Sequence, residues 1–104
     1  EGHREYHALI SLMLSSQTKD TVNMATMEKL RAHGLSIDNI LATSDEDLDA
    51  LIHAVGFHNN KVRYIKKTSA LLKDRHGGAV PDTMDELLAL PGVGPKMALI
   101  LLRV

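Results

Sequence analysis

The stretch Leu90-Pro91-Gly92-Val93-Gly94-Pro95-Lys96 places two glycines between two helical patterns, with a lysine at the start of the second. Pro91 ends the first helix because it cannot donate a backbone hydrogen bond, and Pro95 suits the first position of a new helix. Gly92 and Gly94 permit positive φ angles and the close approach of a ligand. The stretch therefore predicts a helix, a tight hairpin and a second helix.

This hairpin also offers backbone donors to an anion. N–H groups at a helix start have no partner inside the helix and lie at the positive end of its dipole, so we expect Val93, Gly94 and Lys96 to donate to a phosphate. An ordinary connection between two packed helices would explain Pro-Gly alone. The Gly-Val-Gly-Pro-Lys pattern after an amphipathic helix favours the phosphate site. Lys96 is a candidate nucleophile, because the first turn of a helix disfavours an ammonium.

Three motifs in this order resemble the endonuclease III family of the helix-hairpin-helix DNA glycosylase superfamily. They occupy residues 9–20, 55–61 and 90–98, so the resemblance extends over nearly the whole chain. It implies a bifunctional DNA N-glycosylase and abasic-site lyase of base excision repair. The Ser-Ser-Gln-Thr-Lys-Asp and Gly-Val-Gly-Pro-Lys-Met variants resemble the eukaryotic members, which implies action on oxidised pyrimidines in the nucleus and the mitochondrion.

The resemblance implies roles for individual residues. Lys96 falls where the family carries the lysine that attacks the sugar C1′ and forms a Schiff base. Gln17 and Phe57 fall where members insert side chains around the extruded nucleotide, an extrusion that costs roughly a few kcal/mol. A polar loop residue and a core residue are the plainer interpretations of these two. The expected contacts with damaged or abasic double-stranded DNA are Gln17, Phe57, Asn59, Lys61, Gly92, Val93 and Gly94.

Two features of the family have no counterpart in this sequence. The family carries a catalytic aspartate downstream of the hairpin and four cysteines that bind a [4Fe-4S] cluster. This chain has no cysteine, so it cannot supply the thiolates that hold such a cluster. The nearby acids Asp82, Asp85 and Glu86 are better explained as helix caps. We therefore expect weak glycosylase activity at most, with Schiff-base chemistry at an abasic site easier to retain. A non-catalytic helix-hairpin-helix module that binds the DNA backbone is the alternative function.

The composition, with 44% hydrophobic residues in 104, suits one all-α domain of about seven helices. Thr18 or Asp20 is the expected cap of the second helix and Gly34 its end, and Ser36, Ser44 and Thr83 are expected at the starts of the third, fourth and sixth helices. The expected helices are 5–14, 20–32, 36–42, 45–52, 59–76, 83–90 and 95 onward. The last of these stops while still apolar, so we expect a fragment: one domain over 1–104, with 82–104 as the helix-hairpin-helix, lacking the family's cluster-bearing domain. An apolar face should then be exposed, favouring self-association or marginal stability.

Charge is unevenly distributed although the net charge is only −1. An acidic stretch over 38–49 precedes a basic stretch over 61–75, which suits a phosphate-binding face. Two solvated helix faces would give the same pattern. Among the six histidines only His3 and His7 are singled out as an i,i+4 pair, and no His-Glu-x-x-His motif accompanies them, so no metal ligand is predicted. A monovalent cation on the hairpin carbonyls is implied by the resemblance alone.

Overall fold

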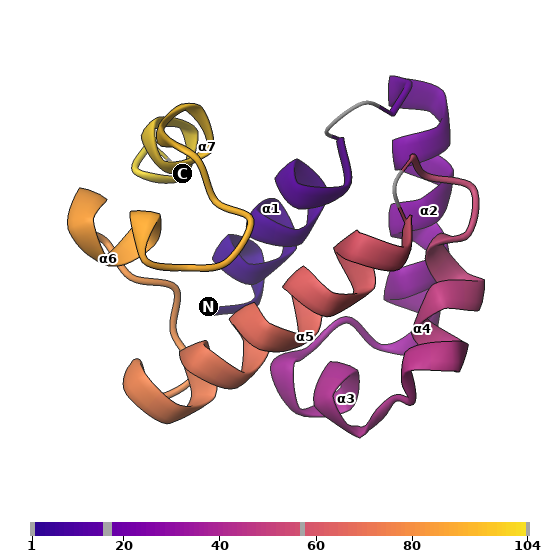
Figure 1. The fold of residues 1–104 in the computed structure, drawn as a ribbon, viewed down its shortest axis with the longest axis horizontal. Coiled ribbons are helices and arrows are strands. Elements are labelled where there is room, and N and C mark those ends of the chain that lie inside the picture. The colour runs from indigo at the N-terminus through magenta and orange to yellow at the C-terminus, as the bar shows by residue number, and fades with distance from the viewer. Residues whose placement is uncertain (1, 16–17, 57, 104) are drawn as a thin grey trace.

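The computed structural model describes residues 2–15, 18–56 and 58–103, and over these it contains seven α-helices and no strand (Figure 1). The predicted all-α class is therefore confirmed. The helices are α1 (Gly2–Ser15), α2 (Asp20–His33), α3 (Ile37–Ala42), α4 (Asp45–Ile52), α5 (His58–Arg75), α6 (Met84–Leu88) and α7 (Pro95–Leu101). Within the described ranges, none of these helices is long and apolar enough to cross a membrane.

Helices α1 and α5 lie side by side at the centre, with α3 and α4 against α5, α2 against α1 and α4, and α7 against α1 (Figure 1). The apolar positions of α1 repeat at helical spacing, so Tyr6, Leu9, Ile10 and Leu14 are all buried in the core. The Tyr6 hydroxyl lies 2.6 Å from Oγ of Ser69 on α5. Burial raises the pKa of Tyr6 to about 12. This buried polar pair joins the two central helices.

Local capping explains where several helices begin and end. The hydroxyls of Ser36, Ser44 and Thr83 each accept a hydrogen bond from the backbone N–H three residues later, as expected of N-caps. Gly34 ends α2 with a φ of 106°, and its N–H donates to backbone carbonyls of the last turn. These boundaries follow from short-range chemistry that is visible in the sequence.

The start of α2 differs from the prediction that Thr18 or Asp20 caps it. The N-cap is Lys19, whose side chain makes no capping hydrogen bond. The Thr18 hydroxyl instead accepts a hydrogen bond from the backbone N–H of Gly56 at 3.2 Å. Thr18 therefore joins the segment before α2 to the connector between α4 and α5.

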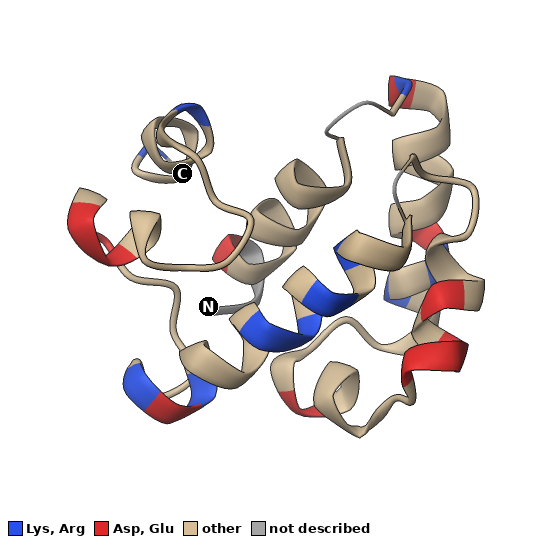
Figure 2. Cartoon of the chain, viewed as in Figure 1, with Lys and Arg blue, Asp and Glu red and all other residues tan. Residues whose placement is uncertain are grey.

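The basic stretch of α5 lies partly against the acidic stretch of α3 and α4 (Figure 2). Nζ of Lys73 lies 3.0 Å from Asp38 Oδ1, and Nζ of Lys66 lies 3.7 Å from Asp45 Oδ1. The Lys66 ammonium also donates to the carbonyl of Thr43. Exposed pairs of this kind contribute roughly 0–1 kcal/mol each. The basic stretch is therefore neither wholly a free phosphate-binding face nor wholly a solvated helix face, because part of its charge faces groups of the same chain.

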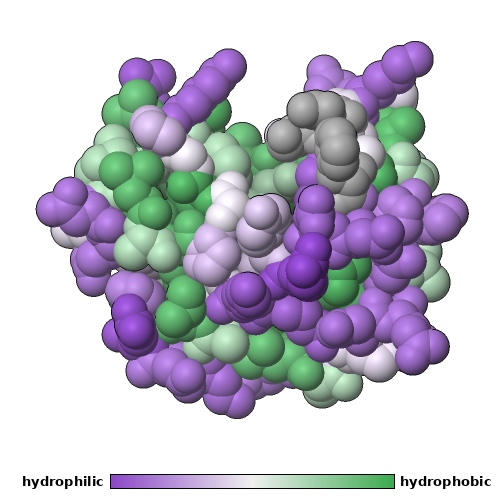
Figure 3. Space-filling view, viewed as in Figure 1, coloured by the Kyte–Doolittle hydropathy of each residue, from purple (hydrophilic) through white to green (hydrophobic). Residues whose placement is uncertain are grey.

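Large apolar side chains remain exposed on the two C-terminal helices and just after them (Figure 3). They are Leu88, Leu99, Ile100 and Leu102, with exposed fractions of 40–51%. The exposed apolar face that was expected from a missing domain stays a prediction.

Candidate functional site

The hairpin between α6 and α7 is held against the central helices. Oγ1 of Thr68, a buried residue of α5, donates to the carbonyl of Pro91 at 2.9 Å. The side chains of Leu90 and Val93 are buried in the core on either side of the turn. The hairpin backbone is therefore fixed by α5 and by its own apolar side chains before any ligand binds.

The structure explains the glycine at position 92 differently from the glycine at position 94. Gly92 has a φ of +80°, and a Cβ there would lie 3.2 Å from Cβ and Cγ of Tyr64. Gly94 has a φ of −98°, so of the two glycines Gly92 alone uses the positive φ that both permit. A Cβ on Gly94 would meet no heavy atom within 4 Å. Packing inside the described chain thus accounts for Gly92 but not for Gly94.

The backbone donors of the hairpin are also unequal. The N–H of Val93 donates to the carbonyl of Leu90 at 3.2 Å, which differs from the expectation that it faces a phosphate. Gly94 is the N-cap of α7, and Pro95 occupies the first turn without an N–H. The N–H groups of Gly94 and Lys96 remain the predicted donors to an anion.

Lys96 lies in the first turn of α7 with its side chain exposed. Lys96 thus faces solvent two residues after Gly94, and its role as a nucleophile stays a prediction. The nearby acid Glu86 is occupied elsewhere, since its carboxylate accepts from the Thr83 hydroxyl at 2.7 Å and lies 3.6 Å from Nδ1 of His76. This agrees with the interpretation of Glu86 as part of a helix cap.

Lys61 is directed inward, although the sequence suggested a DNA contact. Its side chain is only 6% exposed, and Nζ donates to the carbonyl of Leu14 at 3.0 Å and to Oγ1 of Thr18 at 3.4 Å. Burial lowers the pKa of Lys61. An ammonium is favourable there because Leu14 belongs to the C-terminal turn of α1, the negative end of the helix dipole. Lys61 therefore positions backbone within the described chain.

The Lys61 ammonium and the Thr18 hydroxyl link the segment after α1 to the connector before α5, because Thr18 also accepts from Gly56. Gln17 and Phe57, the predicted inserting residues, lie outside the described residues. Asn59 is exposed in the first turn of α5. The proposed insertion segments thus adjoin a common set of hydrogen bonds, and their contacts with DNA stay predictions.

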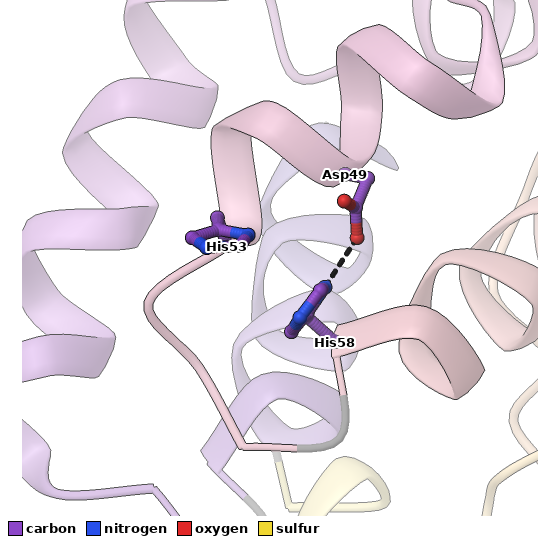
Figure 4. A group of neighbouring side chains, drawn as sticks. All are labelled: Asp49, His53 and His58. Carbon is purple, nitrogen blue, oxygen red and sulfur yellow. Dashed lines mark hydrogen bonds and ion pairs between the residues drawn. The ribbon is translucent and has the colours of Figure 1, made fainter.

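A second cluster of polar side chains lies at the junction of α4 and α5, where the sequence analysis predicted no metal ligand. Asp49, His53 and His58 bring their donor atoms within 4.8 Å of one another (Figure 4). Nδ1 of His58 is hydrogen-bonded to the Asp49 carboxylate. The i,i+4 spacing of Asp49 and His53 was visible in the sequence, but the approach of His58 depends on the turn between the helices. No residue of the chain can provide thiolate ligands for a [4Fe-4S] cluster, because the sequence contains no cysteine.

An all-helical fold with a glycine hairpin and a lysine just inside the following helix defines the helix-hairpin-helix class. The chain belongs to the HhH-GPD superfamily of base excision DNA repair proteins, whose family model matches residues 10–97. It is 59% identical over 95 residues to endonuclease III-like protein 1 of Bos taurus, covering 91% of this chain and 31% of that protein. It is 45% identical over 95 residues to the endonuclease III homolog of Schizosaccharomyces pombe, covering 88% of this chain and 27% of the homolog.

Solved structures give the same result. A trapped endonuclease III–DNA covalent intermediate superimposes with a TM-score of 0.89 at 35% identity, covering 93% of this chain and 46% of that one. A non-covalent endonuclease III–DNA complex gives a TM-score of 0.89 at 34% identity, over 93% of this chain and 45% of its own. A thermostable thymine-DNA glycosylase, at 23% identity and a TM-score of 0.88, shares the fold. The chain spans about a third of the curated relatives' length.

Proposed function

We propose that this chain is the helical, lysine-bearing part of a DNA base excision repair enzyme, a bifunctional N-glycosylase and abasic-site lyase for oxidised pyrimidines in double-stranded DNA. One observation carries the proposal: Lys96 is exposed directly behind a preformed hairpin whose Gly94 has open space around it. Membership of the HhH-GPD superfamily supports it, as does the likeness to an endonuclease III trapped as a covalent intermediate with DNA.

In this proposal the neutral Lys96 amine forms a bond to C1′ of the damaged nucleotide. The bond from C1′ to the base breaks, the base leaves with the electron pair, and the new C1′ ammonium gives a proton to the departing base or to water. The sugar ring then opens as the C1′–O4′ bond breaks and O4′ takes up a proton, and the nitrogen lone pair forms the C1′=N bond of the Schiff base. At a site that is already abasic, the amine condenses with the C1′ aldehyde and water leaves. The second reaction requires no leaving base, so we expect this chain to perform it more readily than base removal.

In this proposal the hairpin binds the DNA backbone. We propose that the N–H groups of Gly94 and Lys96 hold a phosphate next to the lesion, because a phosphate oxygen can approach a glycine more closely than any residue with a Cβ. Gln17 and Phe57 are proposed to fill the gap left by the extruded nucleotide, and Asn59 to contact the adjacent backbone. The nucleus and the mitochondrion are the proposed setting, as the resemblance of the sequence motifs to the eukaryotic members implies.

The test is borohydride trapping on a duplex with one abasic site. Borohydride reduces the Schiff base to a stable amine, so a covalent protein–DNA adduct should form with the native chain and disappear in Lys96→Ala. Lys29→Ala removes an exposed lysine of α2 and is the matched control, which should trap normally. Circular dichroism of each variant checks that the helices are intact.

Fluorescence anisotropy with the same duplex separates the two candidate functions. Binding without a Lys96-dependent adduct would favour the alternative, a helix-hairpin-helix module that only binds the DNA backbone. That alternative is supported by the preformed hairpin, which needs no catalytic lysine. If a folded chain shows neither DNA binding nor a covalent adduct, both functions are refuted for these 104 residues.

A further inference from the structure

The junction of α4 and α5 concentrates three groups that are typical metal ligands. Asp49 and His53 are separated by four residues, so they lie on one face at the end of α4. His53 is the C-cap of α4 and keeps helical backbone angles, with φ −54° and ψ −30°. His58 is the first residue of α5. The turn between the two helices brings its ring back over this face (Figure 4).

The donor atoms of the three side chains already converge. All lie within 4.8 Å of one another, and the centroids of the two imidazole rings are 4.7 Å apart. Ligands at about 2.0–2.1 Å from a tetrahedral zinc ion are separated by about 3.3 Å. The donors that lie farthest apart therefore need to approach each other by roughly 1.5 Å at most. The hydrogen-bonded pair, Nδ1 of His58 and the Asp49 carboxylate, must instead separate to admit an ion between them. Rotation of the side chains can supply both shifts.

The surroundings allow that rotation. His53 is exposed, and its ring contacts His58 but makes no hydrogen bond or ion pair within the described part of the chain. The side chains of His58 and Asp49 are 26% and 32% exposed, so an ion can enter from solvent. The hydrogen bond between Asp49 and His58 holds the carboxylate and the ring facing each other, beside the ring of His53.

We propose that Asp49, His53 and His58 form a binding site for a divalent transition-metal ion of the zinc class. Two imidazoles and one carboxylate are ligands of three-ligand zinc sites, in which a water molecule completes the tetrahedron. Imidazole nitrogen also excludes Mg²⁺ and Ca²⁺ as preferred ions, because those cations select oxygen ligands. Helical spacing accounts for His53 beside Asp49, and the metal site is inferred from the convergence of the donor atoms of all three side chains.

A metal ion at this site joins the last residue of the α4 region to the first residue of α5, closing the connector over 53–58. Phe57, the proposed inserting residue, belongs to that connector. If the proposed DNA function holds, the ion would therefore restrict the segment that enters the duplex. This consequence rests on the proposed function, whereas the metal site itself does not.

Zinc is the probe for the test. Titration of the 104-residue chain with Zn²⁺, in competition with a colorimetric chelator, should show one site per chain. His53→Ala and Asp49→Asn should each weaken Zn²⁺ binding at least about 10-fold, because loss of even an outer-shell partner costs about 10- to 100-fold. Imidazole ¹⁵N spectra should show His53 and His58 shifting together on addition of zinc.

His3→Ala is the matched control, because His3 and His7 are the i,i+4 histidine pair at the other end of the chain. It should leave Zn²⁺ binding unchanged. The proposal is overturned by absence of one-to-one binding, by binding that survives His53→Ala, by binding lost in His3→Ala, or by Mg²⁺ binding as tight as Zn²⁺. Circular dichroism verifies that each variant is folded. If Asp49→Asn does not fold, the Zn²⁺ affinity of His53→Ala alone decides whether the proposal holds. None of these outcomes involves DNA, so they are independent of the trapping experiment.

Discussion

The two hairpin glycines should respond differently to alanine. At Gly92 the φ of +80° is left-handed, which costs an L-residue about 1–2 kcal/mol. The new Cβ would lie 3.2 Å from Tyr64 Cβ and 3.3 Å from Met13 Cε, and such overpacking adds roughly 1–3 kcal/mol. Reduced freedom of the unfolded chain offsets about 0.4–1 kcal/mol. We expect Gly92→Ala to lower the free energy of unfolding by about 1–5 kcal/mol, the net of these three terms.

At Gly94 the same substitution should leave stability nearly unchanged. Its φ of −98° and ψ of 176° are extended angles that alanine adopts freely, and no heavy atom lies within 4 Å of the new Cβ. Alanine is a poorer N-cap than glycine, which lowers the free energy of unfolding. Alanine also restricts the unfolded chain, which raises it. Both effects are of the order of half a kcal/mol, so they largely cancel. The methyl group would instead obstruct a phosphate, so DNA affinity should fall about 10-fold or more, the equivalent of one hydrogen bond to a charged group.

Urea or thermal unfolding followed by circular dichroism measures stability, and anisotropy with an abasic duplex at fixed salt measures binding. A loss of 1 kcal/mol lowers the melting temperature of a domain of this size by about 4–8 °C. Gly78→Ala is the matched control, because its φ of +87° carries the same backbone cost with no atom within 4 Å. Equal destabilisation by Gly92→Ala and Gly78→Ala would refute the packing argument. Unchanged DNA affinity in Gly94→Ala would refute the phosphate argument.

Two further substitutions address the interior. Lys61→Met should lower the free energy of unfolding by about 1–3 kcal/mol in urea titrations, because the Leu14 carbonyl and the Thr18 hydroxyl lose a charged donor; a fully stable variant would contradict the positioning role. Tyr6→Phe should cost about 1 kcal/mol near neutral pH by leaving Ser69 without its 2.6 Å partner. Because the folded pKa of Tyr6 is raised from 10.0 to about 12, the folded state holds its proton more tightly. The contribution of the neutral Tyr6 side chain to the free energy of unfolding is full below pH 10. Roughly 3 kcal/mol of it is lost as the pH rises from 10 to 12. Urea titrations at pH 9 and 11.5 should show this alkaline loss in the native chain and not in Tyr6→Phe.

The sequence was sufficient where short-range chemistry decides the structure. The N-caps at Ser36, Ser44 and Thr83 need only a hydroxyl and an N–H three residues later, and all three were predicted. The turn at Gly92 was predicted for the same reason. At Gly94 the residue type suggested a positive φ, but glycine also occurs where space is needed outside the chain, and a single sequence cannot separate those reasons.

Contacts between distant segments were less predictable. Lys61 was predicted to contact DNA as part of the motif over 55–61, although it precedes the buried Ile65 by four residues and so lies on the core face of α5. Its partner, the carbonyl of Leu14, is 47 residues away. The cluster of Asp49, His53 and His58 was missed for a similar reason. Its third member depends on the geometry of a turn rather than on helical spacing.

Helix α5 connects the two parts of the candidate site. His58 begins the helix, Lys61 lies one turn further on, and Tyr64 and Thr68 contact the hairpin. The ten residues from His58 to Thr68 correspond to about 15 Å of helix. Because a packed helix transmits position without bending, the distance between the connector before α5 and the hairpin that carries Lys96 is set mainly by this one element. A metal ion or substitution at the start of α5 should therefore change the connector itself, while the helix keeps the hairpin, and with it Lys96, at the same distance from the start of α5.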